Sequence, residues 1–168
     1  MFQNKWARKQ RPVLIGAAAP VTGRLFPLRE VNDVNFSHGY LGDGVAIEPA
    51  SDCVVAPFDG IISHIAEAKH ALLLKHASGL QLLIHIGIDT VDLRGEGFDM
   101  LVNVNDRVRL GQPLVQFDLT LIRKAGFSTC AIFIVIGGGQ LVASIECNYR
   151  DVYIGEPDAF RIMLKQIT

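Results

Sequence analysis

Residues 69–89 have the sequence KHALLLKHASGLQLLIHIGID, which gives the clearest indication of the fold. Two apolar runs, 71–75 and 80–86, flank Ser78-Gly79, a dipeptide typical of a tight turn between antiparallel strands. Both runs are short, and neither shows the 3.6-residue spacing of an amphipathic helix. We therefore expect a β-hairpin in this part of the chain.

The same pattern continues along the chain in both directions. Short apolar runs alternate with Gly, Pro, Asp and Ser turn signals at intervals of roughly ten residues, a spacing typical of sandwiches and barrels. One short helix is expected at 119–125, ending at Gly126. The predicted fold class is all-β, an antiparallel β-sandwich or barrel-sandwich of many short strands with one or two short helical turns. The further predicted strands are 13–17, 24–27, 45–47, 53–56, 60–65, 114–118, 131–136 and 161–163.

The hairpin brings two of the five histidines together. If Ser78-Gly79 is a two-residue turn, His70 faces Gly87 and His85 faces Leu72 across the strands. His85 then projects from the same face as His70, and Gly87 leaves room between the rings. A shift of the register by one residue would place the rings on opposite faces. This register also puts Leu72 and Leu83 on the histidine face, which makes it partly apolar.

Paired imidazoles beside an apolar surface suit three kinds of chemistry. They can bind zinc if a carboxylate or thiolate completes the site, act as general acid and base, or attack phosphorus while the second ring supports the phosphoryl oxygens. Each histidine could instead have only a structural role. The residues alone leave these alternatives open.

Composition indicates one globular domain. Of the 168 residues 49% are hydrophobic and 20% charged, with a net charge of −1, which argues against bulk nucleic-acid binding. Six of the 16 basic residues and none of the 17 acidic ones lie in residues 1–29, so the remainder has a net charge of −7. No apolar run is long enough to span a membrane, and no secretory signal is recognisable. The three cysteines fit reduced thiols, so we expect a cytoplasmic protein.

Two segments follow from these patterns. We expect residues 1–11 to form a basic, flexible tail, in which Phe2 and Trp6 would share a helical face and could contact an anionic membrane weakly. Residues 12–168 are predicted to form the folded domain.

Residues 85–98, HIGIDTVDLRGEGF, closely resemble the active-site signature of the glucose-family enzyme IIA component of the bacterial phosphoenolpyruvate-dependent sugar phosphotransferase system. Shorter segments resemble the same family in the same order, so that the resemblance extends over about 12–167. The shorter segments are GDGVAIEP at 42–49, APFDG at 56–60, KHA at 69–71 and GEP at 155–157.

The resemblance implies a phosphotransferase that carries a phosphohistidine and needs no cofactor. His85 matches the residue phosphorylated by the histidine-containing phosphocarrier protein, and it would pass the group to a cysteine of an enzyme IIB domain for sugar uptake. His70 matches the histidine that stabilises the phosphoryl group. Asp33 and Asp89 match acidic positions that face the phosphocarrier. We expect the Gly87 carbonyl to orient the His85 ring.

Partner binding is further assigned to Phe36, Leu72 and Leu83. Family members often have Thr where Ala68 stands, and aromatic residues where Leu72, Leu83 and Ile86 stand, so the choice of partner is open. One alternative is a regulatory binding module of the same fold without efficient phosphoryl transfer. A less favoured one is a lysostaphin-like zinc peptidase, which has its motifs in the opposite order. No metal is expected, although His70 and His85 could bind zinc at a partner interface.

Overall fold

The computed structural model describes residues 13–137 and 141–165. The predicted tail, residues 1–11, lies outside the described residues. Fourteen strands dominate the described chain, and every pairing among them is antiparallel. The strands are β1 (Leu14–Ala17), β2 (Gly23–Pro27), β3 (Gly42–Pro49), β4 (Cys53–Val55), β5 (Gly60–Ile65), β6 (Ala71–Lys75), β7 (Gln81–Ile88), β8 (Phe98–Met100), β9 (Arg107–Val108), β10 (Pro113–Phe117), β11 (Ser128–Ile136), β12 (Val142–Cys147), β13 (Asp151–Val152) and β14 (Phe160–Leu164).

Helical structure is limited to short segments. They are α1 (Val34–Ser37), α2 (Leu119–Lys124) and two 3-10 turns at Leu28–Glu30 and Thr90–Leu93. α2 follows Asp118, whose side chain accepts a hydrogen bond from the Leu121 backbone N–H, and ends before Gly126 as the turn signals predict. Within the described residues, no helix is long and apolar enough to cross a membrane.

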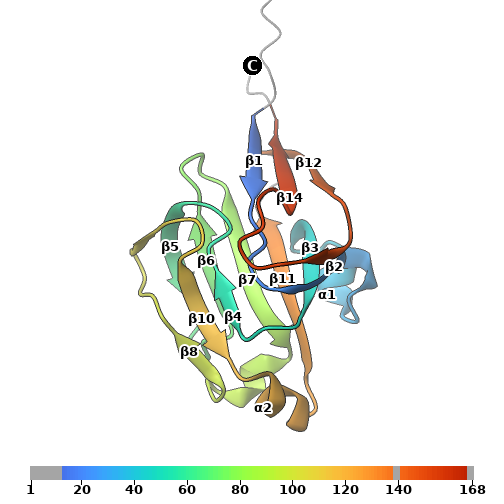
Figure 1. Ribbon diagram of the computed structural model, residues 1–168, viewed down its shortest axis with the longest axis vertical. Helices are drawn as coiled ribbons and strands as arrows, with labels where there is room; N and C mark the ends of the chain where they lie inside the picture. The colour runs from blue at the N-terminus through green and yellow to red at the C-terminus, as the bar shows by residue number, and fades with distance from the viewer. Residues whose placement is uncertain (1–12, 138–140, 166–168) are drawn as a thin grey trace, which may run out of the picture.

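Three sheets build the molecule (Figure 1). The largest has the order β13-β2-β3-β11-β7-β6-β5-β9, and the sheet β4-β10-β8 packs across one of its faces. The third sheet, β1-β14-β12, brings the first and last described strands side by side. The all-β sandwich expected from the sequence is confirmed.

Alternation along the central strands of the large sheet creates two apolar layers. In β7, Leu82 and Ile84 enter the main core, while Leu83 packs on a second cluster on the opposite face. In β11, Phe133 enters the main core and Ile132 the second cluster. The 3-10 turn at residues 28–30 and α1 cover part of that second face, which we call the outer face. Both predicted histidines lie on the outer face.

Candidate functional site

His85 lies in the middle of the large sheet. It pairs with Ala71 of β6 on one side and with Ile132 of β11 on the other, so neighbouring strands hold its backbone from both sides. Because Leu83 and His85 are two residues apart on β7, they project from the same outer face. A side chain on a central strand is positioned rigidly, which suits a reacting group.

The predicted hairpin register is wrong by one residue. His76 accepts a hydrogen bond from the Gly79 backbone N–H at 2.9 Å and donates one to the Leu80 carbonyl at 2.8 Å, so the loop has three residues, Ala77-Ser78-Gly79. Ala71, rather than Leu72, is therefore opposite His85, and His70 is opposite Ile86, whose backbone N–H bonds the His70 carbonyl.

The two rings nevertheless meet. Their centroids are 4.9 Å apart and their planes make an angle of 84°. His70 precedes the first residue of β6, and Lys69 before it has a φ of 61°, so the pleat does not determine the direction of the His70 side chain. The irregular backbone restores the contact that a regular hairpin in this register would have prevented.

The register correction also moves Leu72. It pairs with Ile84, is only 1% exposed and belongs to the main core on the inner face. The prediction that Leu72 lies on the partner-binding face is therefore wrong. Leu83 is half-buried on the outer face, packed on the second cluster, where it was predicted.

Burial keeps both imidazoles uncharged. The pKa of His85 is lowered to about 4, mainly by burial and secondly by the neighbouring His70, while the Gly87 backbone and Asp33 act in the opposite direction. Burial also lowers the pKa of His70. Near neutral pH both rings are neutral, which leaves each with one nitrogen lone pair.

The two nitrogens of each ring have different environments. Nδ1 of His70 and Nδ1 of His85 are buried without a hydrogen-bond partner. Nδ1 of His85 meets no acceptor at full hydrogen-bond geometry, but a backbone hydrogen-bond interaction with Gly87 raises the pKa of the ring, which agrees with the predicted orienting role of Gly87. The Nε2 atoms of the two rings differ from the Nδ1 atoms. Neither Nε2 forms a hydrogen bond with a described residue, and neither is fully buried. Both Nε2 atoms are therefore open to solvent.

Gly87 shapes the backbone below the pair. Its φ is 77°, and a Cβ added there would lie 2.3 Å from Thr90 Cγ2 and 2.8 Å from the Ser128 carbonyl oxygen. The Thr90 hydroxyl donates to the Ile86 carbonyl at 2.5 Å and is fully buried. This bond ties the chain after β7 back to the strand. Asp89, between them, is exposed and has a φ of 61°.

α1 brings two predicted residues to the pair. The ring of Phe36 packs edge-on against His85 with a centroid distance of 5.1 Å, and it is 7% exposed. Asp33 caps the helix by accepting a bond from the Asn35 backbone N–H at 2.9 Å, and it interacts electrostatically with His85. An aspartate immediately before the first residue of a helix is a common N-cap, so Asp33 is a recognisable local signal in the sequence.

Three features near the site were not predicted. One is the buried Thr90. The other two are exposed apolar side chains: Val34 in α1 is 58% exposed, and Val91 in the 3-10 turn at Thr90–Leu93 is 51% exposed. Exposure of single valines depends on packing between distant segments, so no local pattern could have shown it. The remaining histidines form no part of the pair: His38 contacts Tyr40, and His76 contacts Phe58.

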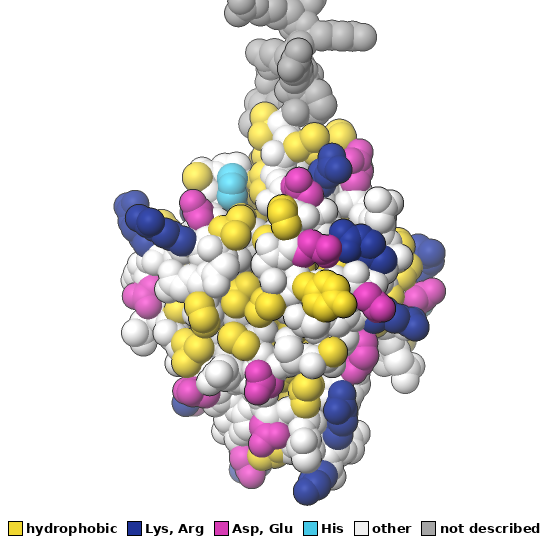
Figure 2. Space-filling model, viewed as in Figure 1, with side chains coloured by type: hydrophobic (Ala, Val, Ile, Leu, Met, Phe, Trp, Pro, Cys, Tyr) yellow, Lys and Arg dark blue, Asp and Glu magenta, His cyan; other side chains and the backbone are white. Residues whose placement is uncertain are grey.

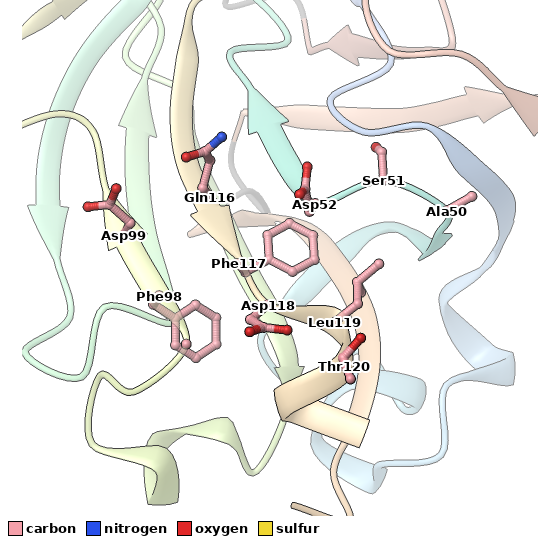
Figure 3. A pocket seen from close by; sticks show the side chains of 11 residues that line it. Ala50, Ser51, Asp52, Phe98, Asp99, Gln116, Phe117, Asp118, Leu119 and Thr120 are labelled. Carbon is pink, nitrogen blue, oxygen red and sulfur yellow. The ribbon is translucent and has the colours of Figure 1, made fainter. Parts of the chain in front are cut away.

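A large cavity lies elsewhere. It has a volume of 890 Å³ and is bounded by the ends of β8 and β10 and the start of α2. Figure 3 shows the carboxylates of Asp52, Asp99 and Asp118 around two phenylalanine rings, with no histidine among its labelled residues. The described part of the chain contains no group of three or more His, Cys, Asp or Glu side chains that could hold a metal ion.

Comparison with known families identifies the class of protein. The family described as "phosphoenolpyruvate-dependent sugar phosphotransferase system, EIIA 1" matches residues 16–140. The chain belongs to this family. The predicted class, a phosphoryl-transfer component and phosphotransferase of a sugar phosphotransferase system, is confirmed at the level of the family. The matched range includes both histidines of the pair.

Individual relatives agree. The PTS system glucose-specific EIIA component of Oceanobacillus iheyensis is 39% identical over 164 residues, 97% of this chain and 99% of the relative. The PTS system glucoside-specific EIICBA component of Staphylococcus carnosus is 46% identical over 128 residues, 76% of this chain and 18% of the relative. The chain thus spans about a fifth of the length of such EIICBA relatives.

A solved structure shares the fold. The glucose permease IIA from Mycoplasma capricolum superposes with a TM-score of 0.78 and 33% sequence identity, covering 88% of this chain and 96% of that one. This similarity supports both the family and the sandwich architecture.

Proposed function

We propose that His85 accepts a phosphoryl group from the histidine-containing phosphocarrier protein and passes it to a cysteine of an enzyme IIB domain during sugar uptake. The observation that carries the proposal is the contact between two neutral imidazoles whose outward nitrogens are both Nε2. The site of action would be the cytoplasm, where such a carrier would meet both partners.

A phosphoryl carrier needs an unprotonated nucleophile. With a pKa of about 4, His85 keeps its lone pair over the whole range near neutral pH. Because Nδ1 is buried, the lone pair that can reach an incoming phosphorus atom is that of Nε2. The proton of the neutral ring then belongs on Nδ1, on the side of the Gly87 backbone.

Each transfer exchanges one bond to phosphorus for another. Nε2 of His85 attacks the phosphorus of the donor phosphohistidine, and the electron pair of the broken N–P bond returns to the donor imidazole. In the second transfer a cysteine thiolate attacks the same phosphorus. The S–P bond forms, and the electron pair of the N–P bond returns to His85, which is again neutral.

His70 supports the phosphoryl oxygens. It stands nearly perpendicular to His85 and is itself neutral, so a proton on its Nε2 can be donated as a hydrogen bond toward the oxygens. An uncharged donor stabilises the transferred group without holding it so strongly that release becomes slow. His70 thus contacts the reacting group without forming a covalent bond.

The surroundings suit protein partners. Phe36 and Leu83 make the rim apolar, which excludes water from the N–P bond and provides a dry contact for a partner. Asp89 is exposed beside this rim and Asp33 is half-exposed, so both carboxylates can guide a basic partner surface to the pair.

The test is a phosphorylation assay with phosphoenolpyruvate, enzyme I and the phosphocarrier, followed by mass spectrometry. We expect an acid-labile adduct of one phosphoryl group, absent in His85→Gln. His70→Gln should accept the group but transfer it to enzyme IIB more slowly. The matched control is His64→Gln, an exposed histidine in β5 of the same sheet, which should behave as the unaltered protein. An adduct retained in His85→Gln refutes the assignment, and no adduct in the unaltered protein favours a binding module.

A further inference from the structure

A basic groove lies at the β9 edge of the large sheet, away from the histidine pair. The groove has a volume of 600 Å³, and its lining includes Lys75, Arg107, Arg109, Ile61 and His76. Figure 2 shows lysine or arginine side chains projecting at the left margin, the side on which Figure 1 places β5. The rest of the folded domain has an excess of acidic residues, so this edge differs in sign from its surroundings.

The strand register aligns the groove residues. Arg107 of β9 pairs with Ile61 of β5, and Ile61 pairs with Lys75 of β6. Paired residues project from the same face, so two cations flank one apolar side chain. Two strand spacings separate Lys75 from Arg107, roughly 10 Å. Ile61 between them is 38% exposed, although it stands within a sheet.

The charges of the groove are not neutralised within the described chain. None of Lys75, Arg107 and Arg109 forms an ion pair with another described residue. The acidic residue in the lining is Asp59, whose Oδ1 already accepts a hydrogen bond from the Leu110 backbone N–H at 2.7 Å. The groove therefore presents a positive charge that an external group can neutralise.

We propose that this groove binds an acidic, extended segment of a protein partner. In an extended chain every second side chain projects from the same side, so carboxylates at positions i and i+4 are separated by roughly 13 Å, within reach of the long, flexible side chains of Lys75 and Arg107. An apolar side chain between them would cover Ile61. A concave surface with an apolar centre fits a peptide chain better than it fits a flat membrane.

The groove and the histidine pair share the outer face but are separable. Lys75 and Ala71 lie four residues apart on β6, roughly 13 Å along the strand, and Ala71 is opposite His85. One partner can therefore cover both sites. No groove residue contacts His70 or His85, so the inference does not depend on phosphoryl transfer.

The test uses the full chain and a fluorescent twelve-residue peptide that repeats Glu-Ser-Leu-Ser. Fluorescence anisotropy measures its affinity at about 50 mM and about 200 mM salt. We expect Lys75→Gln combined with Arg107→Gln to weaken binding by about fivefold. The matched control is Arg123→Gln combined with Lys124→Gln, exposed cations at the end of α2, which should leave the affinity unchanged.

Amide NMR shifts locate the bound peptide. Shifts at residues 61, 75 and 107–109 support the groove, whereas shifts confined to residues 1–11 overturn it. Equal weakening by the control variant also overturns it. Vesicles containing phosphatidylglycerol form the last arm: if they bind through Lys75 and Arg107 while the peptide does not, the occupant is a membrane and the proposal is wrong. Phosphorylation of the groove variant should be normal, so failure at His85 and failure at the groove are distinguishable.

Discussion

The ring of Phe36 stands edge-on against the ring of His85, at a centroid distance of 5.1 Å and an interplanar angle of 60°. Phe36 comes from α1 and His85 from a central strand, so the contact joins the cover of the outer face to the reacting group. Burial is the largest cause of the low pKa of His85. Phe36 is the aromatic neighbour that contributes to this burial.

Truncation of Phe36 should therefore raise the pKa of His85. In Phe36→Ala water reaches the ring, and we expect the pKa to move from about 4 toward 6.5, as followed by NMR titration of the ring protons. Phe36→Leu, which keeps an apolar cover, should leave most of the depression. An unchanged pKa in Phe36→Ala would show that α1 does not shield the site.

The same depressed pKa predicts acid sensitivity. Above pH 6.5 the His85 ring is neutral in both folded and unfolded chains and contributes nothing to the pH dependence. As the pH falls from 6.5 toward 4, the unfolded chain binds the proton first, so the free energy of unfolding decreases, by roughly 3 kcal/mol below pH 4. Urea denaturation at pH 7 and about pH 4.5 should show a larger loss for the unaltered protein than for His85→Gln. Equal losses would contradict the buried neutral state.

Gly87 should be far less tolerant of alanine than Gly79. Both have positive φ, 77° and 91°, but a Cβ at Gly87 meets Thr90 and the Ser128 backbone, while nothing lies within 4 Å at Gly79. We expect Gly79→Ala to cost about 1 kcal/mol from backbone strain alone, and Gly87→Ala about 3 kcal/mol or more. Comparable thermal unfolding of the two variants would show that the crowding at Gly87 is relieved at little cost.

The corrected register separates Leu72 from Leu83. Leu72 lies in the main core, so Leu72→Ala should lower the free energy of unfolding by about 3 kcal/mol. Leu83 is half-buried on the outer face, so Leu83→Ala should cost about 1 kcal/mol and should weaken phosphocarrier binding. Chemical denaturation and titration calorimetry measure the two effects. A reversed order of stabilities would restore the register with Leu72 opposite His85.

Much of the strand pattern could be predicted locally. β5 and β6 begin and end at the predicted residues, because glycine, lysine and apolar runs mark their limits. β12 was not predicted. Its more buried and more exposed residues do not alternate regularly, and the strand is stabilised by pairing with β14, a separate segment of the chain. α1 has only four residues, too few for a helical period to be visible.

The site was predicted for a reason that proved only partly correct. Ser78-Gly79 fits a two-residue turn, but a glycine in the left-handed region also closes the three-residue loop that forms, and local sequence does not distinguish the two. The contact between His70 and His85 survives because the backbone at Lys69 is irregular. A positive φ at a lysine results from tertiary structure, so neither the true register nor its compensation was visible in the residues.

The most direct test of phosphoryl transfer at the pair is to identify the phosphorylated nitrogen. ¹⁵N-histidine-labelled protein, phosphorylated through the phosphocarrier, should show phosphorus–nitrogen coupling at Nε2 of His85, while His70 keeps two unmodified nitrogens. Coupling at Nδ1 of His85, or at either nitrogen of His70, would contradict the account, because Nδ1 of both rings is buried in the structure.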